Sequence, residues 1–217
     1  MESLKNQLSQ YTARQLENFF PDGSAVSSNE LGVAVETSLS SLSECFSYIR
    51  GRYFEGKFSK VFNPLNGDHY AMYLYRLANT VYKDIGDEKL ASKIFLLNKA
   101  LHGIDAFYKV ELPKIFVFVH PQGTILGRGV YKDFFCIYQG CTVGSKHPDL
   151  VYPEFSERTI LYANSTVLGR SKIGKNVVFG AGSILIDRTI EDNQLVLGGP
   201  PNLIRPLEFN PLNSVFF

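Results

Sequence analysis

Residues 159–186 read TILYANSTVLGRSKIGKNVVFGAGSILI, and every sixth side chain in a series through them is large and apolar. These side chains are Leu161, Val167, Ile173, Phe179 and Leu185. Small residues follow three of them at an interval of four, at Ser165, Ser171 and Ser183. A period of six matches neither an α-helix nor an antiparallel sheet. It is typical of a triangular coil of short parallel strands, with one side chain per strand pointing inward and small residues at the corners.

The same period continues toward the N-terminus as far as Val119. Eleven of its twelve positions are apolar or aromatic, and Asp149 is the exception. The earlier positions are Val119, Ile125, Tyr131, Ile137, Val143, Asp149 and Phe155. We therefore expect a triangular parallel β-helix of about four to five turns, with a short C-terminal tail, within residues 111–217.

A stretch of different character surrounds Asp149, between Gly144 and Thr159, and it contains Pro148 and Pro153. We interpret it as a loop extruded from the wall of the β-helix. Loops carried on a rigid scaffold are where binding and chemistry concentrate. The alternative interpretation is an insertion without a function.

Residues 1–110 carry apolar side chains at helical spacing and predict a helical domain. We expect one helix over 3–20, which Pro21 would end, and a second over about 31–49. A third is expected from Asp68 to near Gly86, and a fourth over about 90–101 with Gly103 as its terminator. The predicted fold class is α+β, with a helical domain at 1–110 and a β-helix at 111–217.

Composition excludes several classes of protein. Twenty-two Lys and Arg against 21 Asp and Glu give a net charge of +1, so nucleic acid and anionic membranes are not expected partners. No apolar run reaches the length of a membrane span, and the first residues do not resemble a secretory signal, so we expect a cytoplasmic protein without membrane insertion. The three cysteines, Cys45, Cys136 and Cys141, form no C-x-x-C pair and are interpreted as packing residues.

Several motifs resemble those of the hexapeptide-repeat acyltransferases, which fold as left-handed β-helices, and most of all those of the serine acetyltransferases. The motifs are His120-Pro121, Gly127-Arg128-Gly129, Cys141-Thr142-Val143-Gly144, Gly180-Ala181-Gly182-Ser183 and Gly198-Gly199-Pro200-Pro201. The preceding helical domain is a further similarity. The resemblance implies acetyl-CoA as the donor, direct transfer of the acetyl group with a histidine as general base, and no metal. It also implies a homotrimer with active sites between neighbouring β-helices, and a dimer of trimers is the alternative assembly.

The family's catalytic histidines are replaced in this chain. Where the family has an Asp-His pair after its Gly-Arg-Gly run, this chain has Asp133 followed by Phe134. The family's second histidine, in a His-Pro pair, corresponds to Tyr152 before Pro153. The resemblance therefore retains Asp133 as a residue that holds the acceptor, but it leaves the base to be found among other histidines.

We place His147 first among the candidate bases. It lies in the extruded loop, in a Lys-His-Pro-Asp run that resembles the Thr-His-Pro segment of the galactoside and maltose acetyltransferases. A solvated loop histidine is the alternative interpretation. His120 is the second candidate, against a structural role at the start of the β-helix. His102 is expected to stabilise a helix end and His69 to lie on the surface.

The resemblance also implies residues for the donor. Ala163 and Ala181 correspond to corner positions along which the pantetheine arm lies, with Gly182 and Ser183 beside them. Lys172, Lys175 and Arg205 are candidates for the CoA phosphates, and ordinary surface charge is their alternative role.

The function expected from these residues is transfer of an acetyl group from acetyl-CoA to the hydroxyl of a small acceptor, either L-serine or a sugar or nucleotide sugar. Two alternatives stay open: a β-helix that has lost catalysis and serves in assembly or binding, and an N-acetyltransferase of an amino sugar. A zinc enzyme on a similar β-helix would need three convergent histidines. The repeat region contains His120 and His147 alone.

Overall fold

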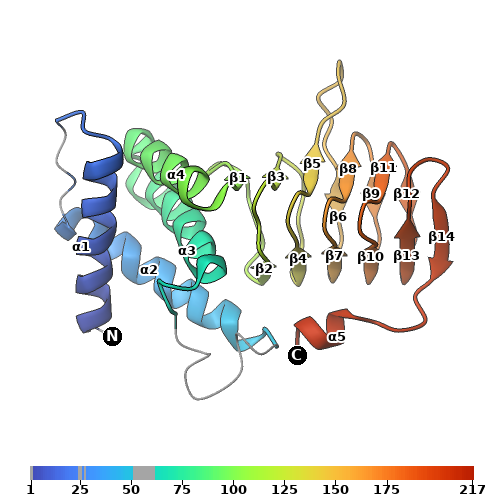
Figure 1. The fold of residues 1–217 in the computed structure, drawn as a ribbon, viewed down its shortest axis with the longest axis horizontal. Helices are drawn as coiled ribbons and strands as arrows, with labels where there is room; N and C mark the ends of the chain where they lie inside the picture. The colour runs from blue at the N-terminus through green and yellow to red at the C-terminus, as the bar shows by residue number, and fades with distance from the viewer. Residues whose placement is uncertain (1, 24–25, 27, 51–61) are drawn as a thin grey trace.

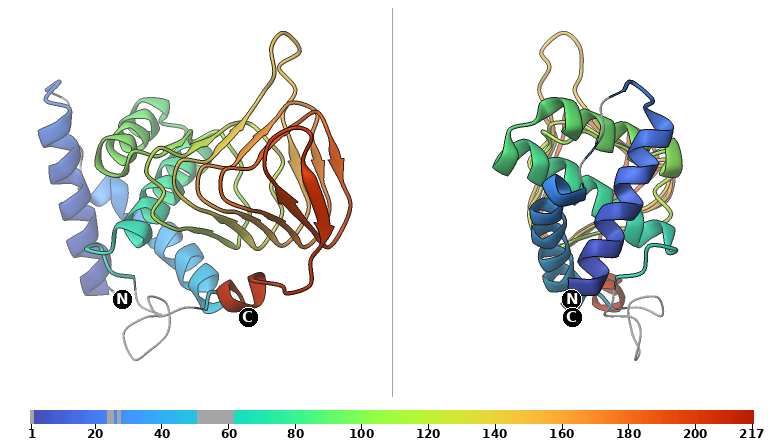
Figure 2. Two further views of the ribbon diagram at one scale, coloured as in Figure 1. Left: turned by 45° about the vertical axis from the view of Figure 1, so that its right-hand side comes forward. Right: turned by 90° about the vertical axis from the view of Figure 1, so that its left-hand side faces the viewer.

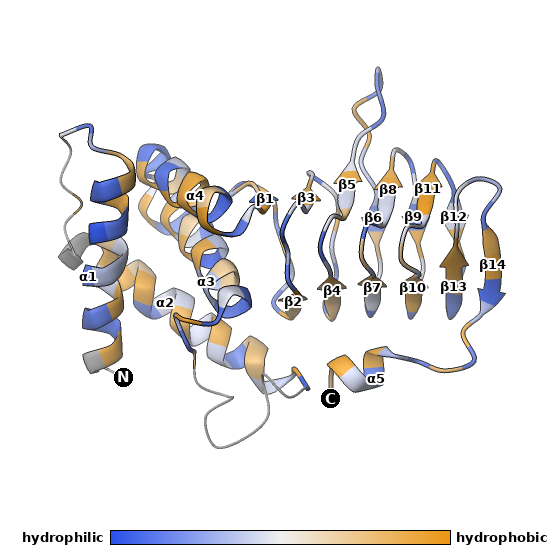
Figure 3. Cartoon of the chain, in the orientation of Figure 1, coloured by the Kyte–Doolittle hydropathy of each residue, from blue (hydrophilic) through white to orange (hydrophobic). Residues whose placement is uncertain are grey.

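The computed structural model describes residues 2–23, 26, 28–50 and 62–217. The first part of the chain is helical, as the apolar spacing predicted. Its helices are α1 (Glu2–Phe19), α2 (Ser28–Ser47), α3 (Gly67–Thr80), the π-helical turn η1 (Val81–Ile85) and α4 (Glu88–His102). Orange and blue alternate along α1 in Figure 3, as expected of an amphipathic helix.

Local sequence accounts for where α3 and α4 begin and end. The Asn66 side chain accepts hydrogen bonds from the amides of Asp68 and His69 and so caps α3, and the Asp87 side chain caps α4 in the same way through the Leu90 amide. At the other end of α4, Gly103 adopts φ 65°, a left-handed conformation that glycine enters without a steric penalty. The predicted terminator of α4 is thus confirmed.

From residue 105 the chain winds into a left-handed parallel β-helix, which confirms the predicted fold class. Figure 1 shows its turns following one another along the long axis of the molecule. Its strands are β1 (Asp105–Ala106), β2 (Phe116–Phe118), β3 (Ile125–Leu126), β4 (Phe135–Ile137), β5 (Thr142–Gly144), β6 (Glu154–Phe155), β7 (Thr159–Leu161), β8 (Thr166–Leu168), β9 (Lys172–Ile173), β10 (Val177–Phe179), β11 (Ile184–Ile186), β12 (Thr189–Ile190), β13 (Gln194–Leu197) and β14 (Leu203–Pro206).

These strands form three sheets, one for each side of the triangular coil. Sheet I has the order β14-β13-β10-β7-β4-β2, sheet II β1-β3-β5-β8-β11, and sheet III β12-β9-β6. Strand β14 is antiparallel to β13, so the chain reverses at the last turn, in the segment that contains the Gly198-Gly199-Pro200-Pro201 motif.

We name the corners that join the sheets by their residues. Corner A joins sheet I to sheet II and contains residues 119–124, 138–141, 162–165 and 180–183. Corner B joins sheet II to sheet III and contains residues 127–129, 145–153, 169–171 and 187–188. Corner C joins sheet III back to sheet I and contains residues 132–134, 156–158, 174–176 and 191–193.

The extruded loop predicted around Asp149 is residues 145–153 at corner B, and it rises above the turns in Figure 1. Val143 pairs with Val167, which is 24 residues later, whereas Val167 pairs with Leu185 after 18 residues. The loop thus lengthens one turn by six residues. Because six equals the repeat period, the sequence pattern continues in phase through the loop, and Asp149 falls on a repeat position although it lies outside the coil.

The expected inward position of Ile125 is wrong. Ile125 is 48% exposed, whereas its neighbour Leu126 is 2% exposed. Leu126 pairs with Val143 after 17 residues, so the first turn is one residue shorter at this side than the six-residue pattern assumes. The buried Thr124 occupies the inner corner of this turn, where its hydroxyl donates to the Tyr138 carbonyl at 2.8 Å.

The helices close the N-terminal end of the β-helix and share its core. In Figure 2 (right) the helices stand in front of the coils. Tyr75 of α3 packs edge-on against Phe116 of β2, with ring centroids 5.6 Å apart. The thiol of Cys45 contacts the Phe116 carbonyl at 3.1 Å, and all three cysteines are buried, as expected of packing residues. The boundary at residues 110 and 111 stays a prediction, and β1 lies on its helical side.

The C-terminal tail returns along the β-helix to α2. It passes beneath sheet I in Figure 1 and contains the short helix α5 (Leu212–Val215). The Arg50 amide donates to the Val215 carbonyl at 2.6 Å, and the Phe217 amide donates to the Tyr48 carbonyl at 2.9 Å. Within the described ranges, no helix is both long and apolar enough to span a membrane.

Candidate active site

The three predicted catalytic residues lie at three different corners of the β-helix. His120 is at corner A, His147 is in the extruded loop at corner B, and Asp133 is at corner C. The structure of a single chain therefore does not bring them together.

At corner A, His120 lies beside a carboxylate from the helical region. The His120 amide donates to Asp68 Oδ1 at 2.9 Å, and His120 Nδ1 lies 3.8 Å from Asp68 Oδ2. The His120 side chain is 70% exposed, whereas that of Asp68 is 17% exposed. Burial raises the pKa of Asp68, while the His120 amide and imidazole oppose this shift by stabilising the carboxylate. The pair combines an accessible base with a partly buried orienting group.

A cavity of about 450 Å³ opens beside this pair. Its lining comes from the start of α3, the end of α4 and corner A: Asn66, Gly67, Asp68, Leu101, His102, His120, Pro121 and Gln122. His102 Nδ1 lies 2.8 Å from Asn98 Oδ1, and burial lowers the pKa of His102. The lowered pKa favours the neutral form of His102, which argues against the expectation that its charge stabilises this helix end.

The predicted donor residues Ala163, Ala181 and Gly182 also lie at corner A, on later turns. The Gly182 amide donates to the Ala163 carbonyl at 2.8 Å, which places these turns in register. Ala181 and Gly182 are exposed, and a Cβ added to Gly182 would meet nothing within 4 Å. Ser183 differs, because its buried hydroxyl bonds to the Gly180 and Val196 carbonyls inside the coil. Corner A thus presents a strip of small residues on the same corner as His120.

The three predicted phosphate contacts lie away from that strip. Lys172 is on β9 in sheet III, and Lys175 is at corner C, where its Nζ lies 3.3 Å from Glu157 Oε2. Arg205 is on β14 and pairs in register with Leu195. Within one chain these cations do not form a cluster.

Corner C is filled by aromatic side chains. Phe134 stands where the family has a histidine. Its ring centroid lies 5.4 Å from that of Phe216 in the tail and 6.0 Å from that of Tyr48. The Arg158 guanidinium lies 5.7 Å from the centre of the same ring. Asp133 Oδ1 accepts the Ile115 amide at 3.0 Å. Asp133 therefore has a structural role in this chain, and the tail covers the corner beside it.

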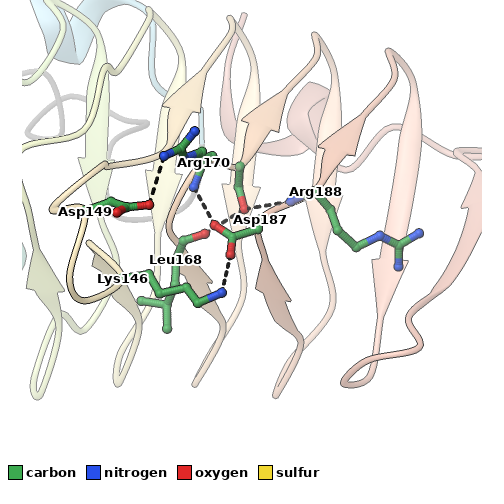
Figure 4. A network of polar contacts seen from close by, with 7 residues as sticks. Lys146, Asp149, Leu168, Arg170, Asp187 and Arg188 are labelled. Atoms are coloured by element: carbon green, nitrogen blue, oxygen red, sulfur yellow. Dashed lines mark hydrogen bonds and ion pairs between the residues drawn. The ribbon is translucent and has the colours of Figure 1, made fainter.

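At corner B, a polar network holds the base of the extruded loop (Figure 4). Asp187 accepts hydrogen bonds from Lys146 Nζ at 2.5 Å and from the Arg170 amide at 2.9 Å. The Arg170 guanidinium in turn donates to Asp149 Oδ2 at 2.8 Å. His147 lies between the two tethered loop residues and is exposed. The network orders the loop around His147. Among the residues that the structure describes, no carboxylate pairs with the His147 imidazole.

Tyr152, which replaces the family's second histidine, packs on a glycine at the same corner. A Cβ added to Gly127 would come within 2.9 Å of the Tyr152 ring, so glycine is required there. In the described part of the chain, no group of three or more His, Cys, Asp and Glu side chains is arranged to hold a metal ion.

Sequence reasoning missed Asp68 as a site residue and was wrong about His69. Asp68 directly precedes His69 at the start of α3, and its proximity to His120 follows from how the helices dock on the first turn. His69 is 2% exposed, with its ring 4.6 Å from that of Phe46, rather than on the surface. The only signal in the sequence was the turn-forming Asn66-Gly67-Asp68 run before an apolar helix.

Comparison with known proteins confirms the expected likeness to serine acetyltransferases. The serine acetyltransferase of Synechococcus elongatus is 30% identical over 111 residues, which cover 50% of this chain and 45% of that protein. Serine acetyltransferase 4 of Arabidopsis thaliana is 28% identical over 137 residues, which cover 62% and 38%. The chain spans about half the length of the curated relatives it matches. No family model matches the chain.

Solved structures show the same fold along nearly the whole chain. The serine acetyltransferase of Neisseria gonorrhoeae superimposes with a TM-score of 0.76 at 21% identity, covering 99% of this chain and 83% of that one. That of Brucella abortus gives a TM-score of 0.73 at 22% identity, covering 94% and 84%. The arrangement of a helical region before a β-helix is therefore common to these proteins and to this chain.

Proposed function

We propose that this chain, whose fold is that of the serine acetyltransferases, is an acetyl-CoA-dependent O-acetyltransferase of a small hydroxyl acceptor. The acceptor is L-serine, which the names of the relatives indicate, or a sugar or nucleotide sugar. The observation that carries the proposal is the His120–Asp68 pair, which lies on the same corner as the strip of Ala163, Ala181 and Gly182. A serine acetyltransferase of the same fold has been solved in complex with CoA.

His120 is the proposed general base. With Nδ1 directed at Asp68, Nε2 is left to accept the proton of the acceptor hydroxyl as its oxygen attacks the thioester carbonyl. The Asp68 carboxylate orients the ring and stabilises the imidazolium that forms. When the C–S bond breaks, the CoA thiolate leaves and takes the proton from the imidazolium, so the base is regenerated. Such a base contributes about 10²–10⁴-fold to a rate.

His147 is the alternative base. Its loop is tethered through Lys146 and Asp149, so the imidazole has a defined place outside the coil. In a homotrimer, a loop that projects from one chain can reach the groove beside its neighbour. Lys172, Lys175 and Arg205 would then contact CoA phosphates across the same groove, which explains why they do not cluster within one chain. Asp133, with its carboxylate used by the Ile115 amide, is not proposed as a catalytic residue.

The proposal includes a homotrimer, with two trimers pairing through the helical region as the alternative, and a cytoplasmic location. It requires CoA and a small acceptor as partners and neither nucleic acid nor metal. Two other functions compete with it: a β-helix without catalysis that serves in assembly, and N-acetylation of an amino sugar. The replacement of both family histidines, by Phe134 and Tyr152, favours the first of these competitors.

The test is acetyl transfer from labelled acetyl-CoA by the full chain, with a pool of hydroxyl and amine acceptors that includes L-serine. We expect an O-acetylated product, and we expect His120→Ala to lower kcat/KM by about 10²–10⁴-fold while His147→Ala lowers it much less. The reverse order would make His147 the base. An N-acetylated product alone would favour the amine alternative. Absence of any product, together with no rise of Tm on adding CoA, would contradict the proposal and favour the assembly role.

A further inference from the structure

The cavity at corner A carries polar groups that are neutral or negative. Asp68 contributes a carboxylate, Asn66 and Gln122 contribute amides, and His102 and His120 contribute imidazoles. None of the described residues that line it is a lysine or an arginine. Lys99, a lysine in the last turn of the adjoining helix α4, has its Nζ 2.6 Å from Asp105 Oδ2 instead.

The hydrogen bonds around His102 indicate which of its nitrogens is available as a hydrogen-bond acceptor. The Asn98 side-chain nitrogen donates to the Ala71 carbonyl at 2.9 Å, so Asn98 Oδ1 is the acceptor for His102 Nδ1. His102 therefore carries its proton on Nδ1, and Nε2 is left with a lone pair. Together with Asp68 Oδ2 and His120 Nε2, it makes the cavity rich in hydrogen-bond acceptors.

Such a lining discriminates between classes of acceptor. A carboxylate or phosphate inside the cavity would lie near Asp68 without a compensating cation, which is electrostatically unfavourable. L-Serine carries a carboxylate, and this group would have no cationic partner in the cavity. A neutral compound with several hydroxyl donors would instead match the acceptors one by one. A cavity of about 450 Å³ is also larger than a three-carbon amino acid needs.

An aromatic surface continues along the same corner. Tyr138 and Tyr162 lie on the two turns after that of His120, with ring centroids 4.9 Å apart and an angle of 42° between the rings. Both are half-buried. Half-buried tyrosine rings on the same corner as these polar groups suit an amphipathic small molecule, and a pyranose ring has this character.

We propose that the acceptor is the hydroxyl of a neutral carbohydrate, whose ring occupies the cavity between Asp68, His102 and Gln122 with the reacting hydroxyl at His120. The proposal depends on the acetyltransferase function proposed above and narrows its acceptor class. Charged groups of a larger acceptor, such as a nucleotide diphosphate, would have to lie outside this cavity.

The first experiment compares acceptors that differ in charge. Methyl glycosides of neutral hexoses and N-acetylhexosamines, the matching methyl hexuronides and L-serine are offered with acetyl-CoA. We expect at least one neutral glycoside to have a kcat/KM at least about tenfold above those of its uronide and of serine, equivalent to 1.4 kcal/mol. Serine or a uronide as the best acceptor would overturn the carbohydrate proposal and leave the acetyltransferase proposal intact.

The second experiment changes the charge of the cavity. Gln122→Lys should lower the KM of the uronide by about tenfold and raise that of the neutral glycoside, because it supplies the missing cation. Gln10→Lys, the same substitution at an exposed site on α1, is the matched control and should change neither. If no acetyl transfer occurs with any acceptor, saturation-transfer NMR still decides: binding of a neutral glycoside that is lost in Gln122→Lys supports the cavity assignment, and absence of binding refutes it.

Discussion

The Asp68 and His120 side chains come from positions 52 residues apart and meet where α3 docks on the first turn of the β-helix. The Asp68 carboxylate lies 3.8 Å from His120 Nδ1, where a negative charge can stabilise the imidazolium that forms during proton transfer. The exposed His147 has no such partner among the described residues, although its loop is ordered. At the scale of single residues, this difference in environment favours His120 as the base.

Asp68→Asn should lower kcat/KM for acetyl transfer by about tenfold to a hundredfold, chiefly through kcat. The side-chain oxygen of the asparagine can still accept the backbone N–H of His120, but the uncharged amide cannot stabilise the imidazolium as a carboxylate does. Steady-state kinetics with the best acceptor would measure the effect. Asp84→Asn, an exposed carboxylate in η1, is the control and should have the activity of the unaltered chain. Equal activities of the two variants would contradict the role given to Asp68.

His69 should make the helical region sensitive to acid. Burial lowers the pKa of His69 to about 4 from 6.5, so between these values the unfolded chain binds a proton that the folded chain does not. The free energy of unfolding should therefore fall as the pH drops from about 6.5 to about 4.

Urea denaturation of the chain and of His69→Phe at pH 7 and pH 5 tests this. The phenylalanine keeps the ring beside Phe46 but cannot be protonated, so its loss of stability between the two pH values should be smaller. His102, whose pKa is also lowered, contributes a loss of the same sign to both proteins. Identical losses in both would show that His69 does not titrate in this way.

At the scale of elements, the tail connects the last turn of the β-helix to α2 and covers corner C. Phe216 is 1% exposed and contacts Phe134, whereas Phe209, seven residues earlier in the same tail, is 74% exposed. Phe216→Ala should lower the free energy of unfolding by about 3–5 kcal/mol, because it leaves a cavity among buried rings. Phe209→Ala should change it by less than about 0.5 kcal/mol. Urea denaturation of both variants provides the comparison, and similar values would mean that the tail does not pack as described.

The extruded loop is a second element whose order depends on a few contacts. Asp187→Ala removes the acceptor for both Lys146 Nζ and the Arg170 amide, so hydrogen exchange in residues 145–153 should become faster. Glu157→Ala, which removes an ion pair with Lys175 at corner C, is the matched control and should leave exchange in the loop unchanged. Hydrogen exchange of the two variants is measured by mass spectrometry on peptides from the loop. Equal exchange in both would contradict the role given to Asp187.

At the scale of the whole molecule, the single chain leaves apolar side chains on the outer face of sheet II. Ile125 is 48% and Ile184 is 39% exposed on this face. Light scattering during size exclusion should give about 73 kDa for three chains of 24.4 kDa, or twice that for paired trimers. A mass of one chain at micromolar concentration would contradict the trimer. It would also contradict the explanation given for why Lys172, Lys175 and Arg205 do not cluster within one chain.

The architecture could be predicted from the sequence because its repeat is local. Each turn packs on the turns beside it, so the six-residue period and the helical stripes report directly on which side chains are inside. Two expectations were wrong for different reasons, since one turn is irregular in length and one side chain is covered by another helix. Ile125 faces outward because the first turn is shortened by one residue, and His69 is buried because α3 packs against Phe46 of α2.

The candidate site depended more on tertiary structure. The sequence identified His120, His147 and Asp133 as a group, but it contained no information on which corner each occupies relative to the docked helices and tail. The structure placed Asp68 beside His120, used Asp133 for the Ile115 amide, and filled the space around Phe134 with Phe216. By itself, the sequence determined a helical region followed by a β-helix, since hydrophobic periodicity acts between neighbouring residues and turns. Only the tertiary structure decided which titratable groups meet, since those contacts join segments that no period relates.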